Sequence, residues 1–190
     1  MFKKIGWSIV FFLVIQVVLY SCCKEKTYNV DLQHIKIIYD NNEAQTVTSE
    51  DLIVYLDFVY NYDEVASILN SNFNFNTALA TTCPNDIYNY NFSFTDLNIT
   101  ADADINGIEA GLSLNSIMKF SYNNIDDLLD ISQFYNPTNN EDFYTPEAPE
   151  TLLFVFDQDI PANTQFKLTF TVQTSNEITY TFTSNTYIIE

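Results

Sequence analysis

Arginine is absent from the 190 residues of this chain, and its seven lysines are outnumbered by 25 acidic residues, for a formal net charge of −18. Arginine is the side chain best suited to pairing with phosphate and carboxylate groups, and nucleic-acid binding requires a basic surface. The composition therefore excludes a nucleic-acid-binding protein. It leaves cations, neutral sugars and other polypeptides as partners.

Histidine is almost absent as well. The one histidine, His34, falls inside a β-branched apolar stretch, where an ordinary strand residue is expected. No Gly-x-Ser-x-Gly segment accompanies it, so the sequence shows no nucleophile with a neighbouring base. Paired carboxylates can hydrolyse glycosides, but among 25 acidic residues no pair stands out. We therefore expect a protein that is not an enzyme.

The N-terminal segment combines a basic start with a short apolar run. Lys3 and Lys4 precede an apolar stretch from Ile5 to Leu19, which is the organisation of a secretory signal. The stretch is about 15 residues long, whereas a membrane-spanning helix needs about 20. We expect residues 1–21 to be a signal peptide that is cleaved, and an uncleaved anchor is the alternative.

The residues around the cleavage point, Leu19-Tyr20-Ser21-Cys22, resemble a bacterial lipoprotein signal. In that pattern Leu19 fills position −3, Ser21 fills position −1 and Cys22 receives the lipid. Tyr20 departs from the small residue usual at −2. Cys23 is the rival acceptor, but it would place Cys22 at −1, where a small residue is expected. The resemblance implies lipidation of Cys22, for example with palmitate, and a membrane anchor outside the cytoplasm; an ordinary cleaved signal is the alternative.

Residues 22–27 are expected to form a lipidated tether, followed by one domain over residues 28–190. The segment Cys23-Lys24-Glu25-Lys26 resembles in part the surface-export signals of Bacteroidota lipoproteins, which implies an outer-membrane or cell-surface location. Loss of Lys3 and Lys4 with the signal leaves five lysines against 25 acids, a formal charge of −20. That charge opposes docking of the protein surface on anionic lipid, so the acyl chains must supply the anchor.

Three cysteines are present, and Cys22 is assigned to the lipid. In an oxidising compartment Cys23 and Cys83 are left either to form a disulfide or to stay apart, with Cys83 as a small buried hydrophobic residue. The spacing does not distinguish these alternatives. The cysteines and His34 lack the spacing of a zinc site.

Alternation of apolar and polar residues predicts that most of the chain is β-structure. Asp51 to Tyr62 is apolar on both faces, which indicates a central strand, and a slip in the alternation at Asp96 predicts a β-bulge. In the strand over Asp51–Tyr62, Leu52, Val54, Leu56, Phe58 and Tyr60 lie on one face, and Ile53, Tyr55 and Val59 lie on the other. A clean half-buried strand is expected where Phe166, Leu168, Phe170 and Val172 alternate with polar residues. Other strands are predicted over Val30–Tyr39, Ile87–Thr100, Leu152–Asp157, Gln165–Thr174 and Glu177–Ile189.

One helix is predicted over Ile125–Tyr135, because Ile125, Leu128 and Leu129 have helical spacing and Asp126 and Asp127 suit its first turn. About seven strands with one short helix predict an all-β fold, an antiparallel β-sandwich with Ig-like architecture. The sequence lacks the Cys…Trp…Cys pattern of antibody domains.

From Thr77 onward the chain resembles a Bacteroidota envelope lipoprotein family of unknown function. The resemblance rests on the segments 76–80 (NTALA), 97–100 (LNIT), 110–115 (AGLSLN) and 182–189 (FTSNTYII). It implies a sandwich domain exported to the envelope, and it implies no activity.

The segment Asp102-Ala103-Asp104-Ile105-Asn106-Gly107 has the first half of an EF-hand calcium loop, with oxygen ligands at positions 1, 3 and 5 and glycine at 6. Position 12 is Ser113 instead of a bidentate glutamate, and a strand precedes the loop where a helix would be expected. Two interpretations follow: a turn rich in Asp and Asn, or a weak calcium site at Asp102, Asp104 and Asn106. No other cofactor is predicted.

We therefore expect a membrane-anchored envelope lipoprotein that acts as a non-catalytic binding or structural module. The alternative is a surface glycan-binding accessory of a nutrient-uptake system. The chain holds 16 phenylalanines and 13 tyrosines, but its one tryptophan, Trp7, leaves with the signal. Tyrosine can stack on sugars, although the missing indole weakens that interpretation. The sequence identifies neither a protein nor a glycan partner.

Overall fold

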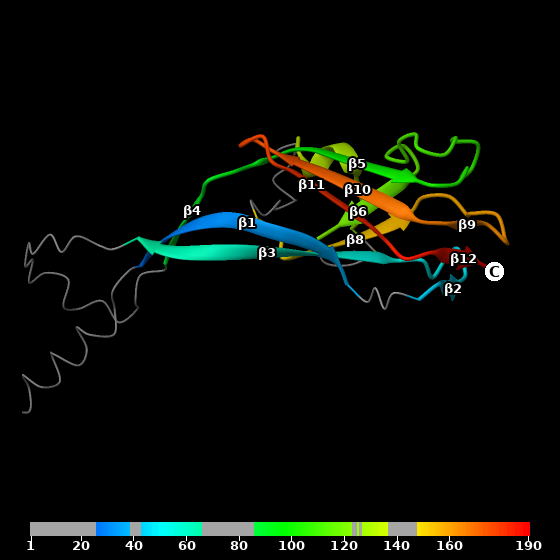
Figure 1. Ribbon diagram of the computed structural model, residues 1–190, viewed down its shortest axis with the longest axis horizontal. Coiled ribbons are helices and arrows are strands. Elements are labelled where there is room, and N and C mark those ends of the chain that lie inside the picture. The colour runs from blue at the N-terminus through cyan, green and yellow to red at the C-terminus, as the bar shows by residue number, and fades with distance from the viewer. Residues whose placement is uncertain (1–25, 39–42, 66–85, 123–124, 126, 137–147) are drawn as a thin grey trace, which may run out of the picture. The chain divides into compact units, whose positions relative to one another are not determined.

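The computed structural model describes residues 26–38, 43–65, 86–122, 125, 127–136 and 148–190 (Figure 1). These residues confirm the predicted all-β class: they form twelve strands and one short 3₁₀ turn, and no helix among them is long and apolar enough to cross a membrane. The elements are β1 (Thr27–Ile37), β2 (Gln45–Val47), β3 (Val54–Val65), β4 (Ile87–Tyr90), β5 (Phe94–Ala101), β6 (Met118–Ser121), β7 (Leu129–Asp130), η2 (Ile131–Phe134), β8 (Thr151–Phe156), β9 (Gln165–Phe166), β10 (Leu168–Thr174), β11 (Thr179–Thr183) and β12 (Tyr187–Ile189).

The chain divides into two compact units, and strands β1 and β3 each contribute to both. The described part of unit 1 is residues 26–30, 62–65 and 86–89, with the strand order β4-β1-β3. Unit 2 contains the rest of the described chain. There the order is β1-β3-β8-β6-β7, with β3 and β6 both antiparallel to β8.

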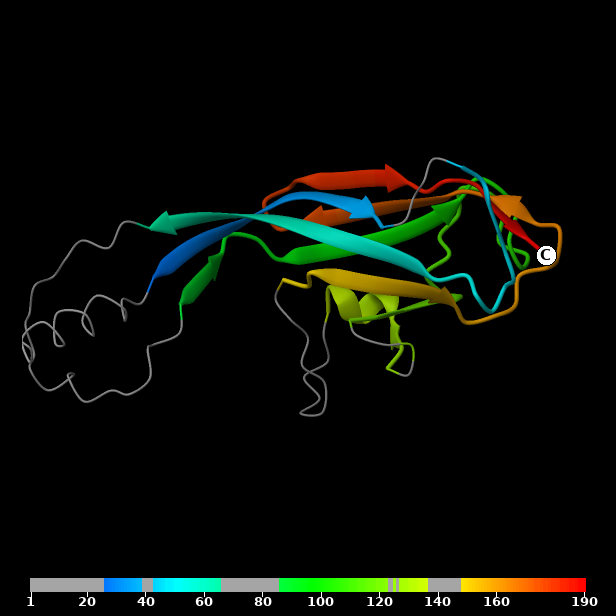
Figure 2. The same cartoon turned by 90° about the horizontal axis from the view of Figure 1, so that it is seen from below.

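Unit 2 contains two further sheets of three strands each. In one of them β10 lies between β5 and β11 and is antiparallel to both (Figure 2). In the other, β12 is parallel to β2 and antiparallel to β9, so this sheet is mixed. The described residues therefore form three sheets.

The hydrophobic core lies in unit 2 and is rich in phenylalanine. Phe154 of β8 meets Phe170 of β10 with ring centroids 5.4 Å apart, so the sheets that hold β8 and β10 share one core. The buried face predicted for the strand after Gln165 is confirmed, because Phe166, Leu168, Phe170 and Val172 are all buried. Of the two apolar faces around Leu52–Tyr60, one is buried at Leu52, Val54, Leu56 and Phe58, and the other is half-buried at Ile53, Tyr55 and Val59. Strand β3 has a partner on each side, as its two apolar faces predicted.

The predicted β-bulge is also confirmed. The register between β10 and β5 shifts by one residue where Gln173 pairs with Asp96 and Thr174 pairs with Phe94. The extra residue is Thr95, next to the position where the alternation slips in the sequence.

The expectation of about seven strands was wrong, because three predicted strands are each divided in two and because β2, β6 and β7 lie outside the predicted strand ranges. Ile87–Thr100 becomes β4 and β5, Gln165–Thr174 becomes β9 and β10, and Glu177–Ile189 becomes β11 and β12. At the second break the backbone N–H of Lys167 donates to the Asp102 carboxylate (2.6 Å). At the third break Ser184 Oγ accepts a hydrogen bond from the Leu168 N–H (2.9 Å). The strands on either side of this break, β11 and β12, belong to different sheets. Apolar and polar residues alternate without interruption across the first two breaks, so the pattern does not reveal them. At the third break residues 183–186 are all polar and the alternation stops.

The helix predicted over Ile125–Tyr135 was wrong in type and extent. Leu129 and Asp130 form β7 and pair with Phe120 and Lys119, and among the described residues of this range only Ile131–Phe134 is helical, as the 3₁₀ turn η2. Ile131 and Phe134 are both buried, whereas Ile125 and Leu128, whose spacing predicted the helix, are exposed. Pairing with β6 outweighs the local helical preference.

Candidate functional site

Cys22, the predicted lipid acceptor, lies outside the described residues, as do Cys23 and Cys83. Lipidation of Cys22 and the disulfide between Cys23 and Cys83 therefore stay predictions. His34 lies on β1 with an exposed side chain, beside exposed Gln33, where the alternation of buried residues shifts by one between Leu32 and Ile35.

The calcium loop predicted from the sequence is a network of hydrogen-bonded turns. A carboxylate oxygen of Asp102 accepts from the Lys167 N–H, and one of Asp104 accepts from the Ala110 N–H at 2.8 Å. The Asn106 amide instead donates to the Asp159 carbonyl oxygen at 3.2 Å. The three side chains thus hold three different backbone segments. Among the described residues no three His, Cys, Asp or Glu side chains gather as a metal-binding group.

The positive φ angles of this loop explain its Asn-Gly dipeptide. Asn106 (φ 51°) and Gly107 (φ 82°) lie between Ile105 and Ile108, whose backbones exchange two hydrogen bonds of 3.0 and 2.9 Å. A two-residue hairpin turn of this kind needs positive φ at both central positions, which Asn-Gly provides. Ile105 is fully buried, so the turn also closes the core. The calcium site stays a prediction for a binding experiment.

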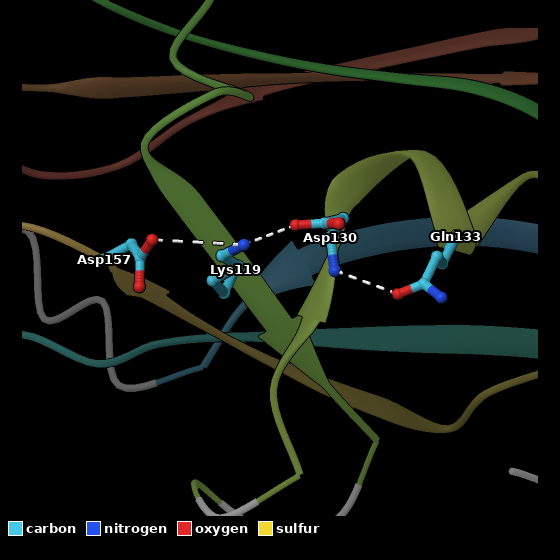
Figure 3. Close-up of polar contacts among 4 residues, drawn as sticks. All are labelled: Lys119, Asp130, Gln133 and Asp157. Atoms are coloured by element: carbon cyan, nitrogen blue, oxygen red, sulfur yellow. Dashed lines mark hydrogen bonds and ion pairs between the residues drawn. The ribbon is translucent and has the colours of Figure 1, made fainter.

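A second polar cluster connects β6, β7 and the end of β8 (Figure 3). Lys119 lies opposite Asp130 in the β6–β7 register; its ammonium group hydrogen-bonds to the Asp130 carboxylate and lies 4.0 Å from that of Asp157. The hydrogen bond to Asp130 raises the Lys119 pKa, so this lysine stays charged and is unsuited to act as a nucleophile. The Gln133 side chain accepts from the Asp130 N–H at 3.1 Å. This cluster fixes β7 and η2 against β6.

The outward face of the sheet β11-β10-β5 carries a regular array of polar side chains, here called the polar face. Cross-strand pairing sets Thr169 beside Thr183 and Thr100, and Thr171 beside Thr181 and Asn98. The Thr169 and Thr183 hydroxyls are 2.9 Å apart. Neighbouring strands lie about 4.8 Å apart, so the hydroxyls and amides repeat at short intervals. The polar face comprises Asp96, Asn98, Thr100, Thr169, Thr171, Gln173, Thr179, Thr181 and Thr183.

In unit 1, three tyrosines from three strands meet and are here called the tyrosine cluster. The rings of Tyr28 and Tyr88 stack with centroids 5.5 Å apart, and Tyr62 contacts Tyr88 edge-on at 6.0 Å. Tyr62 and Tyr88 are 49% and 46% exposed. Beside them the Lys26 ammonium pairs with the Glu64 carboxylate at 3.0 Å, and this contact raises the Lys26 pKa.

No known protein family, no curated protein and no solved structure matches this chain. The site description therefore rests on the residues themselves. The sequence analysis missed both the tyrosine cluster and the polar face, because each is made by cross-strand neighbours far apart in the sequence. The available signal was local: tyrosine recurs at alternate positions 60, 62 and 88, 90, and threonine at 179, 181 and 183.

Proposed function

We propose that this protein is a lipid-anchored, non-catalytic binding or structural module of a bacterial cell envelope, exposed at the outer membrane or cell surface. The observation that carries the proposal is the leader, in which Leu19 and Ser21 precede Cys22 after a short apolar run. The charged residues that follow Cys22 support the surface location. The binding partner is a polypeptide or a glycan.

The same proposal includes the finer architecture. We infer that the sheets of unit 2 pack as an Ig-like antiparallel β-sandwich, supported by the antiparallel pairing of β10 with β5 and β11 and by the contact between Phe154 and Phe170. The three-stranded mixed sheet would then close one end of the core through the buried side chains of Tyr187 and Ile189.

Metabolic labelling with an alkyne fatty acid tests the anchor. The wild-type chain and Cys23→Ala should both be labelled, and Cys22→Ala should lose the label, because only the cysteine after the cleavage point receives the lipid. Labelling that persists in Cys22→Ala and disappears in Cys23→Ala would move the anchor by one residue. Absence of label in all three proteins would refute the proposal.

A second candidate function, glycan binding as an accessory of nutrient uptake, is favoured by the polar face. Its threonine hydroxyls and its Asn98 and Gln173 amides donate and accept hydrogen bonds, as neutral sugar hydroxyls require, and the net charge of −18 disfavours anionic sugars. A glycan array should show binding that Thr171→Val weakens, since valine keeps the shape and loses the hydroxyl. Thr46→Val, at an exposed position on β2, is the matched control. An array without binding would remove this candidate.

A further inference from the structure

The strand ends of unit 1 expose apolar side chains on both faces of the sheet. Tyr62 (49%) and Tyr88 (46%) lie on the face of the tyrosine cluster, and Val65 (41%) and Ile87 (45%) lie on the opposite face, because side chains alternate along a strand. These four are half of the exposed large apolar residues in the described chain, although unit 1 supplies few of its residues. Each face of this sheet end thus carries large apolar side chains next to an exposed acidic residue, Glu64 on one face and Asp63 on the other. Such a mixed surface suits the boundary between water and lipid, whereas a ligand platform needs only one face.

The same strand ends lie next to the predicted anchor in the sequence. Lys26, the first described residue, is four residues after Cys22, and an extended chain spans at most about 3.5 Å per residue, so the two are at most about 14 Å apart. When the acyl chains of Cys22 are in the bilayer, the start of β1 is held at the headgroup layer. Lys26 is in turn tied to the other strands, since its carbonyl oxygen accepts from the Ile87 N–H at 2.8 Å.

We propose that the strand ends of unit 1 insert into the headgroup–acyl boundary of the membrane that holds the lipid anchor. Tyrosine is enriched at this boundary because its ring is apolar and its hydroxyl stays hydrated. The inference rests on the proposed lipidation of Cys22. It assigns the tyrosine cluster, together with Val65 and Ile87, to a second and weaker membrane contact beside the acyl chains.

The negative charge of this surface favours zwitterionic over anionic lipid headgroups as its partner. It also argues against a second copy of the chain as the partner. Around the cluster, Lys26 is the one basic side chain among the described residues of unit 1, and Asp63, Glu64 and Asp86 are acidic. The mature chain has a formal charge of −20, so two copies repel each other, and anionic headgroups repel the same surface. The contact is therefore with zwitterionic headgroups, and adding anionic lipid should weaken it at low salt.

The mature chain is suited to a site-specific test because Trp7, its one tryptophan, leaves with the signal. The variants Tyr88→Trp, Val65→Trp and Leu112→Trp would each carry a single indole, on the two faces of unit 1 and at an exposed turn of unit 2. Each acylated protein is reconstituted in phosphatidylcholine vesicles with brominated acyl chains. The emission of Tyr88→Trp and Val65→Trp should be quenched and blue-shifted relative to Leu112→Trp.

Mass spectrometry of the N-terminal peptide separates failure of the anchor from failure of the membrane contact. Acylated protein whose three indoles are quenched equally, or not at all, would overturn the insertion and leave the lipoprotein function intact. Quenching of Tyr88→Trp alone would also overturn it, because insertion requires both faces. A peptide without acyl chains would overturn the function and the inference together. Circular dichroism of each variant, compared with the wild type, ensures that the fluorescence reports on folded protein.

Discussion

The side chain of Asn115 makes two hydrogen bonds to the backbone edge of β5, as a neighbouring strand would. The stability of the protein should therefore be sensitive to substitution of Asn115. Its Oδ1 accepts from the Ile99 N–H at 3.0 Å, and its amide group donates to the Leu97 carbonyl oxygen at 2.7 Å. Asn115→Ala would leave both partly buried backbone groups without these bonds. Each costs about 1 kcal/mol or more, so we expect a loss of about 2–3 kcal/mol in the free energy of unfolding.

Urea unfolding followed by circular dichroism measures this loss. With a typical urea dependence of about 2 kcal/mol per molar, the midpoint should fall by about 1 M and the slope should not change. Ser116→Ala, at the exposed neighbouring position, is the matched control and should stay within about 0.5 kcal/mol of the wild type. If Asn115→Ala were as stable as this control, the edge of β5 would not depend on the side chain.

Asn115→Asp separates the two hydrogen bonds. The new carboxyl group can still accept from Ile99, but when ionised it faces the Leu97 carbonyl oxygen without a proton to donate. Folding then favours the protonated acid and raises its pKa above the unfolded value of about 3.9. The deficit relative to the wild type should be smallest below about pH 4 and should grow as the pH rises through the raised pKa. A deficit that does not change with pH would contradict the assigned geometry.

Four further predictions concern the core, a tyrosine, the net charge and the loop. Phe170→Asp would bury a charge beside Phe154 and should cost several kcal/mol in urea unfolding, while the wild type should show a far-UV spectrum dominated by β-structure. Burial raises the pKa of Tyr122 to about 12, so the wild type should lose stability from about pH 10 to 12 more steeply than Tyr122→Phe, which cannot ionise there. Modest salt should raise the melting temperature of the mature chain by screening its formal charge of −20. If the Asp102 loop is only a turn, calcium should stabilise no more than sodium of equal ionic strength, and an excess that Asp102→Asn with Asp104→Asn removes would establish the site.

Local sequence patterns predicted the strands well where burial alternates, as along Leu52–Tyr60 and Phe166–Val172, because period two follows directly from the geometry of a strand. They also located the bulge near Asp96. They did not predict the breaks at Lys167 and Ser184, since each depends on a side-chain hydrogen bond formed across the fold. The helix over Ile125–Tyr135 was also predicted wrongly. There the decisive contact is the pairing of β7 with β6, which a local pattern does not contain.

The candidate sites depended even more on long-range contacts. The tyrosine cluster joins residues 28, 62 and 88, and the polar face joins residues 96–100, 169–173 and 179–183. Neither group of residues lies within one contiguous segment of the sequence. Periodicity can therefore show which residues share a face of one strand, but it does not show which strands are neighbours. The leader, in contrast, is read from contiguous residues, which is why lipidation at Cys22 is the sharpest functional prediction from the sequence.

The parallel pairing of β12 with β2 has a consequence for the order of folding. Gln45 pairs with Tyr187, so β2 lacks its partner until about 140 further residues have been made. In a chain threaded through a membrane from its N-terminus, this mixed sheet must close last, after β9 and β12 have emerged. Until then the apolar side chains of Phe166, Tyr187 and Ile189 lack their cover in the finished sheet, which makes the late intermediate prone to aggregation.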